Sequence, residues 1–463
     1  MDSVKHYCGV VGIFSQEKSN IPEQLYFPLF SLQHRGQESA GITYVKEERF
    51  ATFKDLGSVG SVLSHYLNEE HLSYAGIGHV RYSTAGGNLW DNAQPIHITC
   101  NRGEIALAHN GNISNADKLR ERLSHEGAIF QSTSDTELVL HMLSRSRKID
   151  FFDGITEVLK HLEGAFSMVL LHRDMLIGIR DPLGFRPLYI GQKEGMTMIA
   201  SETCALDTHE ITEYRSVEPG EMVIVTKEGV RSERFNSSPR IAQCVFEMIY
   251  FARPDSEIYN QSVHINRKKM GAALAKVDTV EADLVIPVPD SGNFAALGYS
   301  QESGVPFDFG LTRNHFAGRS FIQPTKSKRE MAVKMKLHPN KETLKGKRVI
   351  MVDDSLVRGT TSRTIVKLLR QAGASEVHLR LSSPELHWPC FFGIDVPTRD
   401  ELISNHKTPD EIAEMIGADS VMFLPIEELE HCVEEPNKFC YACFNGDYPV
   451  HVPLKSEGVL KNG

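Results

Sequence analysis

The sequence predicts an α+β domain followed by an α/β domain with a parallel sheet. From Ala282 onward, apolar segments typical of buried strands alternate with helical patterns, which indicates a doubly wound parallel sheet. Upstream of Phe235, helical and extended segments are mixed without that alternation, so periodicity indicates only α plus β. The polar, turn-rich string NSSPR that follows Phe235 marks the expected boundary, which gives domains over residues 8–235 and 236–463.

Composition limits the classes of function. The length of 463 residues suits two or three domains with real cores. A net charge of −10 argues against nucleic acid or a membrane surface as the main partner. No apolar run reaches membrane-spanning length and the first residues, MDSVKHY, lack the apolar core of a signal peptide, so we expect a cytoplasmic protein. Its eight cysteines are then expected to be thiols, metal ligands or nucleophiles rather than disulfides.

Local patterns place several elements in the first domain. Helical patterns run from Asp117 to His125 and from Thr136 to Ser144. Extended patterns run from Ser167 to Leu171, from Leu176 to Arg180 and from Met196 to Ala200.

In the second domain, the stretch from Arg348 to Leu368 reads as strand, loop and helix. Asp353 and Asp354 lie at the carboxyl end of that strand, the edge where open α/β sheets bind ligands. Two carboxylates about 4 Å apart repel by roughly 4 kcal/mol at an effective dielectric near 20, so a positive or hydroxylic partner is expected. The loop from Arg358 to Ser362 opens a helix with backbone N–H groups and a flexible Gly359, which favours phosphate. Together these features predict a sugar phosphate site.

Two further segments of this domain are candidates. The strand LVIPV ends in PDSGN, where Asp290 and Ser291 are short enough to let a phosphate or its Mg²⁺ approach. A capped helix start is the alternative interpretation of that turn. The basic stretch from Arg313 to Glu330 has little periodicity, and it reads either as a loop that closes over a substrate or as solvated surface.

In the first domain, Cys8 heads an apolar segment, CGVVGIF. Alone, such a cysteine is most often a small core residue. A nucleophilic cysteine needs a base beside it, and a cysteine at the start of a chain can use its own α-amino group, whose ordinary pKa is about 7.7–8.0. Five ordered motifs follow Cys8: LQHRGQESAGI, GHVRYST, ALAHNGNISN, STSDTE and IRDPLGFRPLYIG.

These motifs resemble the class II glutamine amidotransferase domain of the amino-terminal nucleophile hydrolases, over roughly Cys8 to Phe235. The resemblance implies two layers of strands between two layers of helices, and removal of residues 1–7 as a propeptide. It also implies catalysis by Cys8 with the oxyanion donors Asn110 and Gly111, and glutamine binding by Arg35, Arg81 and Asp135.

The strings VDDSLVRGTT and PDSGN resemble the substrate loops of type I phosphoribosyltransferases. Where relatives read Tyr-Val-Gly-Arg-Thr, this chain has FAGRS and so lacks one tyrosine hydroxyl. The resemblance implies Mg²⁺ ligands Ser291, Asp353 and Asp354. The implied phosphoribosyl diphosphate-binding residues are Asp290, Ser291, Gly292, Arg319, Asp353, Asp354, Ser355, Arg358, Gly359, Thr360 and Thr361.

Both halves together resemble the glutamine phosphoribosyl diphosphate amidotransferases, along essentially the whole chain. That family begins purine synthesis: ammonia from glutamine displaces pyrophosphate at C1 of the ribose. The resemblance further implies a dry internal channel for neutral ammonia, feedback inhibition by purine nucleotides and a homotetramer.

Four cysteines suggest a metal centre. Cys244, Cys390 and the C-x-x-C pair Cys440 and Cys443 permit zinc, an iron–sulfur cluster or no metal, on spacing alone. The strings HWPCFFGID and CYACFNGDYP, however, resemble the subclass with a [4Fe–4S] cluster. The resemblance implies a structural cluster that fastens the carboxyl-terminal tail, and Cys100, Cys204 and Cys432 are expected to be buried thiols.

Two alternatives remain open at this point. One is a class II amidotransferase with a sugar phosphate acceptor, which VDDSLVRGTT disfavours. The other is a regulator that only senses phosphoribosyl diphosphate, which the acidic balance and the complete glutaminase motifs disfavour.

Overall fold

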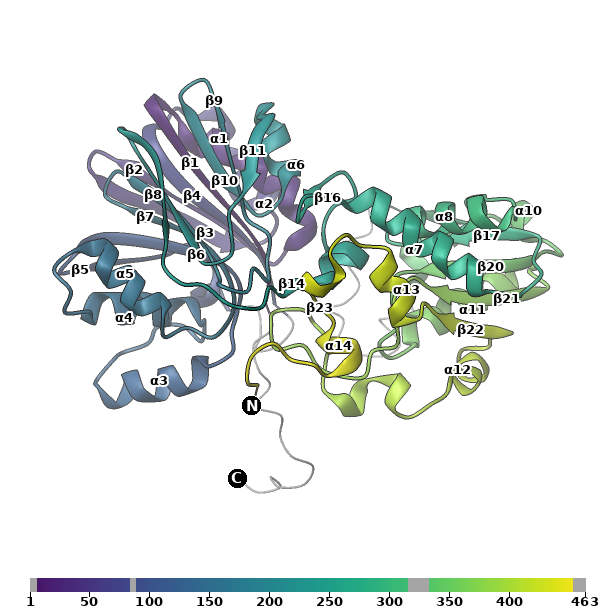
Figure 1. Cartoon of the computed structure of the whole chain (residues 1–463). Helices are drawn as coiled ribbons and strands as arrows, with labels where there is room; N and C mark the ends of the chain where they lie inside the picture. Colours follow the sequence, from purple (N-terminus) through teal and green to yellow (C-terminus); the bar gives the residue numbers. More distant parts are fainter. Residues whose placement is uncertain (1–5, 84–88, 315–332, 453–463) are drawn as a thin grey trace.

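The computed structural model describes residues 6–83, 89–314 and 333–452. It has two lobes side by side, one built from the amino-terminal half of the chain and one from the carboxyl-terminal half (Figure 1). In the described part of the chain, no helix combines the length and the hydropathy that crossing a bilayer requires.

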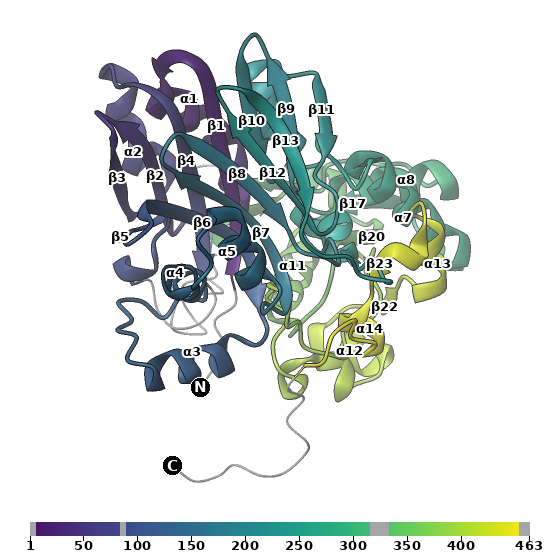
Figure 2. The same cartoon turned by 60° about the vertical axis from the view of Figure 1, so that its left-hand side comes forward.

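Two antiparallel sheets form the amino-terminal lobe. Their strands are β1 (His6–Asn20), β2 (Ser39–Lys46), β3 (Arg49–Leu56), β4 (Leu72–Ser83), β5 (Ile96–Cys100), β6 (Gly103–Ile113), β7 (Gly164–His172), β8 (Met175–Arg180), β9 (Tyr189–Lys193), β10 (Met196–Ala200), β11 (Glu213–Ser216), β12 (Glu221–Thr226) and β13 (Gly229–Arg234). The first sheet has the order β11-β9-β10-β1-β4-β2-β3, and the second has the order β13-β12-β8-β7-β6-β5. Figure 2 shows the two sheets from a second side.

Helices cover the outer face of each sheet. The first sheet carries α1 (Ile21–Ser31), α2 (Val59–Leu63) and α6 (Thr203–Leu206), and the second carries α3 (Ala116–His125), α4 (Thr136–Arg145) and α5 (Phe151–Leu159). Side chains alternate along β1: Val11 and Ile13 join the cluster on the helix side, while Val10 and Phe14 join the cluster between the sheets. Gly12 also faces the other sheet, because a Cβ there would lie 2.6 Å from Leu176. The expected four-layer arrangement is thus confirmed.

The carboxyl-terminal lobe is built on a parallel sheet of order β17-β20-β21-β22, as predicted. Ile350 and Val352 pack on one face of this sheet, and Val349 and Met351 pack on the other, so both faces are covered. The strands are β17 (Leu284–Pro287), β20 (Arg348–Asp353), β21 (Glu376–Leu381) and β22 (Ser420–Phe423), and the principal helices are α7 (Val263–Val277), α8 (Asn293–Ser303), α11 (Thr360–Gln371) and α12 (Pro409–Ile416).

The elements expected from periodicity form with small changes at their ends. The two helical patterns are α3 and α4, and the three extended patterns are β7, β8 and β10. The remaining short elements include β15 (Glu257–Ile258), β16 (Gln261–Ser262), β18 (Leu311–Arg313), β19 (Leu337–Pro339), α10 (Lys341–Leu344) and α13 (Ile426–His431).

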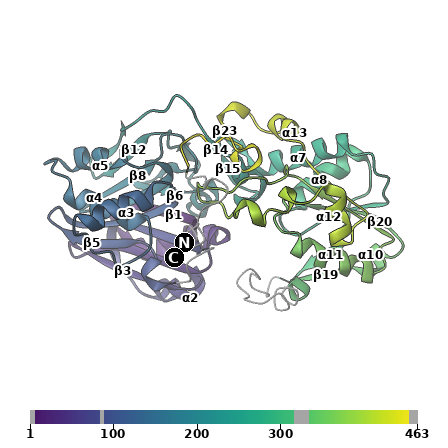
Figure 3. The ribbon, with the colours of Figure 1, turned by 90° about the horizontal axis from the view of Figure 1, so that it is seen from below.

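The carboxyl-terminal tail returns to the segment that joins the lobes. That segment contains β14 (Gln243–Cys244) and a π-helical turn, η5 (Glu247–Phe251). In the tail, β23 (Phe439–Cys440) pairs in parallel with β14, with Cys244 opposite Cys440, and α14 (Ala442–Asn445) follows it. Seen from below, β14 and β23 lie together between the lobes (Figure 3).

Candidate active sites and thiol pocket

Cys8 lies on β1 and faces the second sheet. It has the same strand parity as Val10 and Phe14, which pack between the sheets, and its side chain is fully buried. Burial raises the pKa of the Cys8 thiol to about 12, against the opposing effect of the Arg81 charge. The strand continues upstream of Cys8, where His6 and Tyr7 pair with Ser83 and Tyr82. In the full-length chain the α-nitrogen of Cys8 is therefore a peptide nitrogen that cannot act as a base.

Arg81 lies on β4, directly across the ladder from Cys8. Its guanidinium is buried, and none of its three nitrogens has a hydrogen-bond partner among residues 6–83, 89–314 and 333–452. The groups that act on its charge are Cys8, Glu38 and Asp135. A buried guanidinium whose donors are unsatisfied is costly, and a carboxylate would satisfy them in bidentate geometry.

Asn110 lies on β6 and alternates in step with Ala106 and Ala108, so its side chain points between the two sheets, as that of Cys8 does. It is only 1% exposed, and neither its Oδ1 nor its Nδ2 has a partner in the described structure. Gly111 has a φ of 151°, and a Cβ there would lie 2.1 Å from the Ala165 carbonyl oxygen, so only glycine fits. An oxyanion hole requires fixed hydrogen-bond donors in a site without water, and the Asn110 side chain and the Gly111 N–H meet this requirement.

Asp135 occupies the N-cap position of α4 without a side-chain capping bond, and its Oδ2 accepts a hydrogen bond of 2.9 Å from the Ile113 N–H. Gln94, for which the sequence predicted no role, connects β6 to the start of α4. Its Oε1 accepts from the His109 N–H at 2.8 Å, and its Nε2 donates to Thr136 Oγ1 at 3.0 Å. No periodicity marks Gln94; the only local signal is the Gln–Pro step in DNAQPI.

Arg35 ends the short helix η1 (Leu32–Arg35) and lies behind the nucleophile strand. Its Nε donates to the Cys8 carbonyl oxygen at 3.0 Å, and its other two nitrogens bind Glu202 and Glu247. Arg186 also binds Glu247, at 2.9 Å. All of these side chains are buried, so Arg35 orients Cys8 with every guanidinium nitrogen already bound to protein.

In the carboxyl-terminal lobe, the two predicted loops meet at the carboxyl ends of β17 and β20. Ser291 Oγ donates to Asp353 Oδ1 at 3.2 Å. Gly292 allows this approach, because a Cβ there would lie 2.3 Å from the Val352 carbonyl oxygen. Asp290 is ion-paired with Arg313.

Asp353 and Asp354 are both nearly buried. Burial and the adjacent Asp354 raise the pKa of Asp353 well above its ordinary value. Ser355 Oγ donates to Asp354 Oδ1 at 2.5 Å, and the Asp354 N–H donates to Asp353 Oδ1 at 2.9 Å. Crowded carboxylates beside a serine hydroxyl have the oxygen chemistry that Mg²⁺ prefers, so the residues present fit this ion.

The predicted phosphate loop leads into α11. Gly359 is its N-cap with a φ of 70°, and Thr360 and Thr361 are exposed in the first turn. Arg358 forms an ion pair with Glu401, a partner that the sequence analysis did not anticipate. Arg319 lies outside the described residues.

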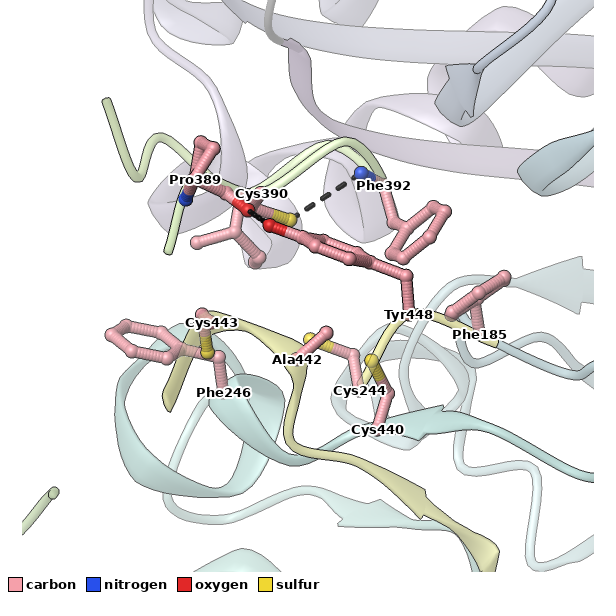
Figure 4. A pocket seen from close by; sticks show the side chains of 11 residues that line it. Phe185, Cys244, Phe246, Pro389, Cys390, Phe392, Cys440, Ala442, Cys443 and Tyr448 are labelled. Atoms are coloured by element: carbon pink, nitrogen blue, oxygen red, sulfur yellow. Dashed lines mark hydrogen bonds between the residues drawn. The ribbon is translucent and has the colours of Figure 1, made fainter. Parts of the chain in front are cut away.

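Four cysteines line one cavity between the lobes (Figure 4). The cavity has a volume of about 20 Å³, and its walls include Phe185, Phe246, Phe392 and Tyr448. Its thiols come from four segments: Cys244 on β14, Cys390 in a loop, Cys440 on β23 and Cys443 on α14. Burial raises the pKa of Cys244 to about 12 and that of Cys443 well above its ordinary value.

These thiols are not disulfide-bonded. Across the described ranges, no three His, Cys, Asp or Glu side chains are arranged to hold one metal ion. A [4Fe–4S] cluster has a different requirement, because each thiolate binds a different iron and the sulfurs need not converge on one point. Four thiols around one apolar cavity therefore fit a cluster, and they do not fit a single ion.

Comparisons with known proteins agree with this geometry. Residues 79–208 match a family model described as a glutamine amidotransferase domain. The chain is 47% identical over 446 residues to amidophosphoribosyltransferase 2, chloroplastic, of Arabidopsis thaliana. This match covers 96% of this chain and 79% of that protein. It is 44% identical to the amidophosphoribosyltransferase of Methanocaldococcus jannaschii, in a match that covers 96% of this chain and 98% of that protein.

A solved structure has the same fold along the chain. It is the glutamine phosphoribosylpyrophosphate amidotransferase from B. subtilis complexed with ADP and GMP, with a TM-score of 0.89 and 43% identity. The match covers 97% of this chain and 99% of that one. With this identity over nearly the whole length, and both predicted sites present on one polypeptide, the chain belongs to the amidophosphoribosyltransferase family, the glutamine-dependent enzymes of the first committed step of purine biosynthesis.

Proposed function

We propose that the chain performs this family reaction with Cys8 as the glutaminase nucleophile and with Asp353 and Asp354 at the phosphoribosyl site. The observation that carries the proposal is the buried group around Cys8. Arg81 lies across the ladder from it, and Asn110 points into the same space between the sheets from β6, each with unsatisfied buried polar atoms. An amino acid amide satisfies both: its α-carboxylate binds Arg81, and its carboxamide oxygen binds Asn110.

The glutaminase steps follow from these positions. Removal of residues 1–7 frees the α-amino group of Cys8, which takes the thiol proton. The sulfur attacks the carboxamide carbon, and the negative oxygen is bound by Asn110 Nδ2 and the Gly111 N–H. One such donor typically lowers the barrier by about 2.7–4 kcal/mol. The C–N bond then breaks, ammonia leaves, and water hydrolyses the thioester to release glutamate.

At the second site, Asp353 and Asp354 bind the ribose hydroxyls, and the first turn of α11 binds the 5′-phosphate. Ser291, Asp353 and Asp354 would hold Mg²⁺, which offsets charge on the pyrophosphate when it is bound. Ammonia attacks C1 of the ribose as the bond to pyrophosphate breaks, giving 5-phosphoribosylamine. Positioning carries most of this step, because the nucleophile is already neutral.

Ammonia must stay unprotonated between the two sites. A low-dielectric passage disfavours the ammonium form, so we propose internal transfer rather than release to water. The segment that joins the lobes contains the buried apolar residues Val245, Met248 and Ile249, which supports an apolar route for ammonia.

We also propose that the thiol pocket holds a [4Fe–4S] cluster with a structural role. Cys244, Cys390, Cys440 and Cys443 would each bind one iron, which joins the interlobe segment, the loop at Cys390 and the tail. Burial disfavours the charged thiolate, which is why the pKa values of Cys244 and Cys443 are raised. Positively charged iron would offset this cost.

Regulation and assembly are further parts of the proposal. The B. subtilis relative was solved with ADP and GMP, which supports feedback inhibition of this chain by purine nucleotides. A nucleoside monophosphate carries the same ribose phosphate as the substrate, so we expect it to compete at α11. We further propose that the chain forms a homotetramer. We also propose that it is cytoplasmic, which its free cysteines support because thiols stay reduced in that compartment.

The test combines mass with turnover. We expect an intact mass that lacks residues 1–7, and glutamate release that phosphoribosyl diphosphate stimulates. A full-length mass, together with glutamate release that phosphoribosyl diphosphate does not stimulate, would make a metabolite sensor the better interpretation. AMP, GMP and ADP titrations that show no competition with phosphoribosyl diphosphate would reject the shared nucleotide site alone.

A further inference from the structure

The loop that carries Cys390 is bound to the amino-terminal lobe at two points. The Asn112 side-chain Nδ2 donates to the Phe391 carbonyl oxygen at 2.8 Å, and Arg186 Nη2 donates to the Phe392 carbonyl oxygen at 3.1 Å. Both acceptors belong to residues 389–394, which also supply walls of the thiol pocket (Figure 4). The loop at Cys390 therefore contacts the glutaminase lobe through its backbone, directly beside a proposed iron ligand.

The first contact leads to the oxyanion strand. Asn112 is two residues beyond Asn110 on β6, so the two side chains leave the same face of the strand. Asn112 is opposite Ala165 in the ladder with β7, close to the end of that ladder at Ile113. A hydrogen bond at this position restrains the end of β6 that bears Asn110 and Gly111.

The second contact leads to the nucleophile strand. Arg186 binds Glu247 at 2.9 Å, Glu247 binds Arg35 at 2.7 Å, and Arg35 binds the Cys8 carbonyl oxygen at 3.0 Å. All four of these residues are almost completely buried. One six-residue loop thus reaches both sides of the glutaminase site through uninterrupted contacts.

We propose that Asn112 is a positioning residue that couples metal occupancy of the thiol pocket to the geometry of the oxyanion strand. Metal binding at Cys390 fixes residues 389–394, and the bond from Asn112 to Phe391 transmits that order to Asn110 and Gly111. The inference rests on the proposed cluster. Asn112 touches no substrate; it acts through the backbone of β6.

Asn112 is suited to a clean test because it is only partly buried, so Asn112→Ala removes one hydrogen bond and leaves the core intact. Asn115→Ala is the matched control. Asn115 follows β6 by two residues and forms hydrogen bonds with His161 and Glu163, and in the described part of the chain none of its hydrogen bonds reaches residues 389–394. Both variants lose local bonds at the same end of the strand, and only one loses the link to the loop.

The main readout is amide hydrogen exchange of β6 in the processed chain, residues 8–463. Metal-free protein is compared with protein reconstituted anaerobically with ferrous iron and sulfide, and iron is counted in each sample. We expect reconstitution to slow exchange of the peptide that contains residues 109–113 in the wild-type chain and in Asn115→Ala. In Asn112→Ala the iron content should be unchanged, and the slowing should be lost.

A kinetic readout separates positioning from binding. Loaded Asn112→Ala should hydrolyse glutamine with a kcat about threefold to tenfold lower, the effect expected for one neutral hydrogen bond. Its KM for glutamine should stay within about twofold, because Arg81 and Asp135 are untouched. Iron uptake that leaves exchange of residues 109–113 unchanged in the wild-type chain would overturn the coupling alone. A chain that takes up no iron would overturn the cluster and the coupling with it.

Discussion

Replacing Asn110 with alanine should lower activity and preserve or raise stability. The side chain is 1% exposed, and its amide N–H and carbonyl groups have no partner among the described residues. Each buried unsatisfied polar group costs about 1–3 kcal/mol, so the folded chain bears a penalty that alanine removes. The same amide is the proposed donor to the oxyanion, where its loss costs about 2.7–4 kcal/mol of barrier, or 10²–10³ in kcat.

The assay follows glutamate release by the processed chain at saturating phosphoribosyl diphosphate, together with urea unfolding of the same preparations. For Asn110→Ala we expect kcat to fall by about 10²–10³ while KM for glutamine changes little, because the donor acts mainly in the transition state. The free energy of unfolding should be equal to or above that of the wild type. Asn115→Ala, which loses bonds to His161 and Glu163 outside the site, should keep its kcat.

Two results would refute this reasoning. A kcat within about threefold of wild type would mean that Asn110 is not an oxyanion donor. A loss of stability of about 2 kcal/mol or more would mean that its amide is satisfied in the folded protein and that its burial carries no penalty.

Three further predictions follow from the same contacts. Glu247→Ala leaves Arg35 and Arg186 buried without their shared carboxylate, so unfolding in urea should show a loss of about 3–5 kcal/mol; an unchanged midpoint would contradict a buried ion network. Asp354→Asn should lower ammonia-dependent phosphoribosylamine synthesis by about 10–100-fold while unstimulated glutaminase activity stays intact, and equal losses in both assays would argue against separate sites. In the unprocessed chain, burial raises the pKa of Cys8 to about 12, so its alkylation by iodoacetamide should rise about tenfold per pH unit from pH 7 to 10; a plateau near pH 8 would show an ordinary thiol.

Local patterns in the sequence predicted much of the fold. The helices α3 and α4 and the strands β7, β8 and β10 form where periodicity placed them, because alternation and the helical repeat depend on neighbours in the chain. The meeting of Ser291 with Asp353, 62 residues apart, also follows from a general rule: carboxyl ends of adjacent parallel strands share an edge.

Long-range partners were beyond what the sequence could predict. Arg35 stands in a recognisable motif, but its carboxylate partners Glu202 and Glu247 carry no local signal. The same holds for Glu401, which pairs with Arg358, and for the bond from Asn112 to a backbone carbonyl 279 residues away. Such pairs depend on how the two lobes and their loops pack, which no local periodicity encodes. The roles proposed for individual site residues, including Arg319, remain predictions.

The central claim is that one chain releases ammonia at Cys8 and uses it at Asp353 and Asp354 without losing it to solvent. The most direct measurement supplies amide-¹⁵N glutamine, phosphoribosyl diphosphate and Mg²⁺ to the processed chain in the presence of excess unlabelled ammonium. We predict 5-phosphoribosylamine whose amine is enriched in ¹⁵N far above the bulk ammonium pool. Product whose label matches the bulk pool, or glutamate formed without any phosphoribosylamine, would contradict the account.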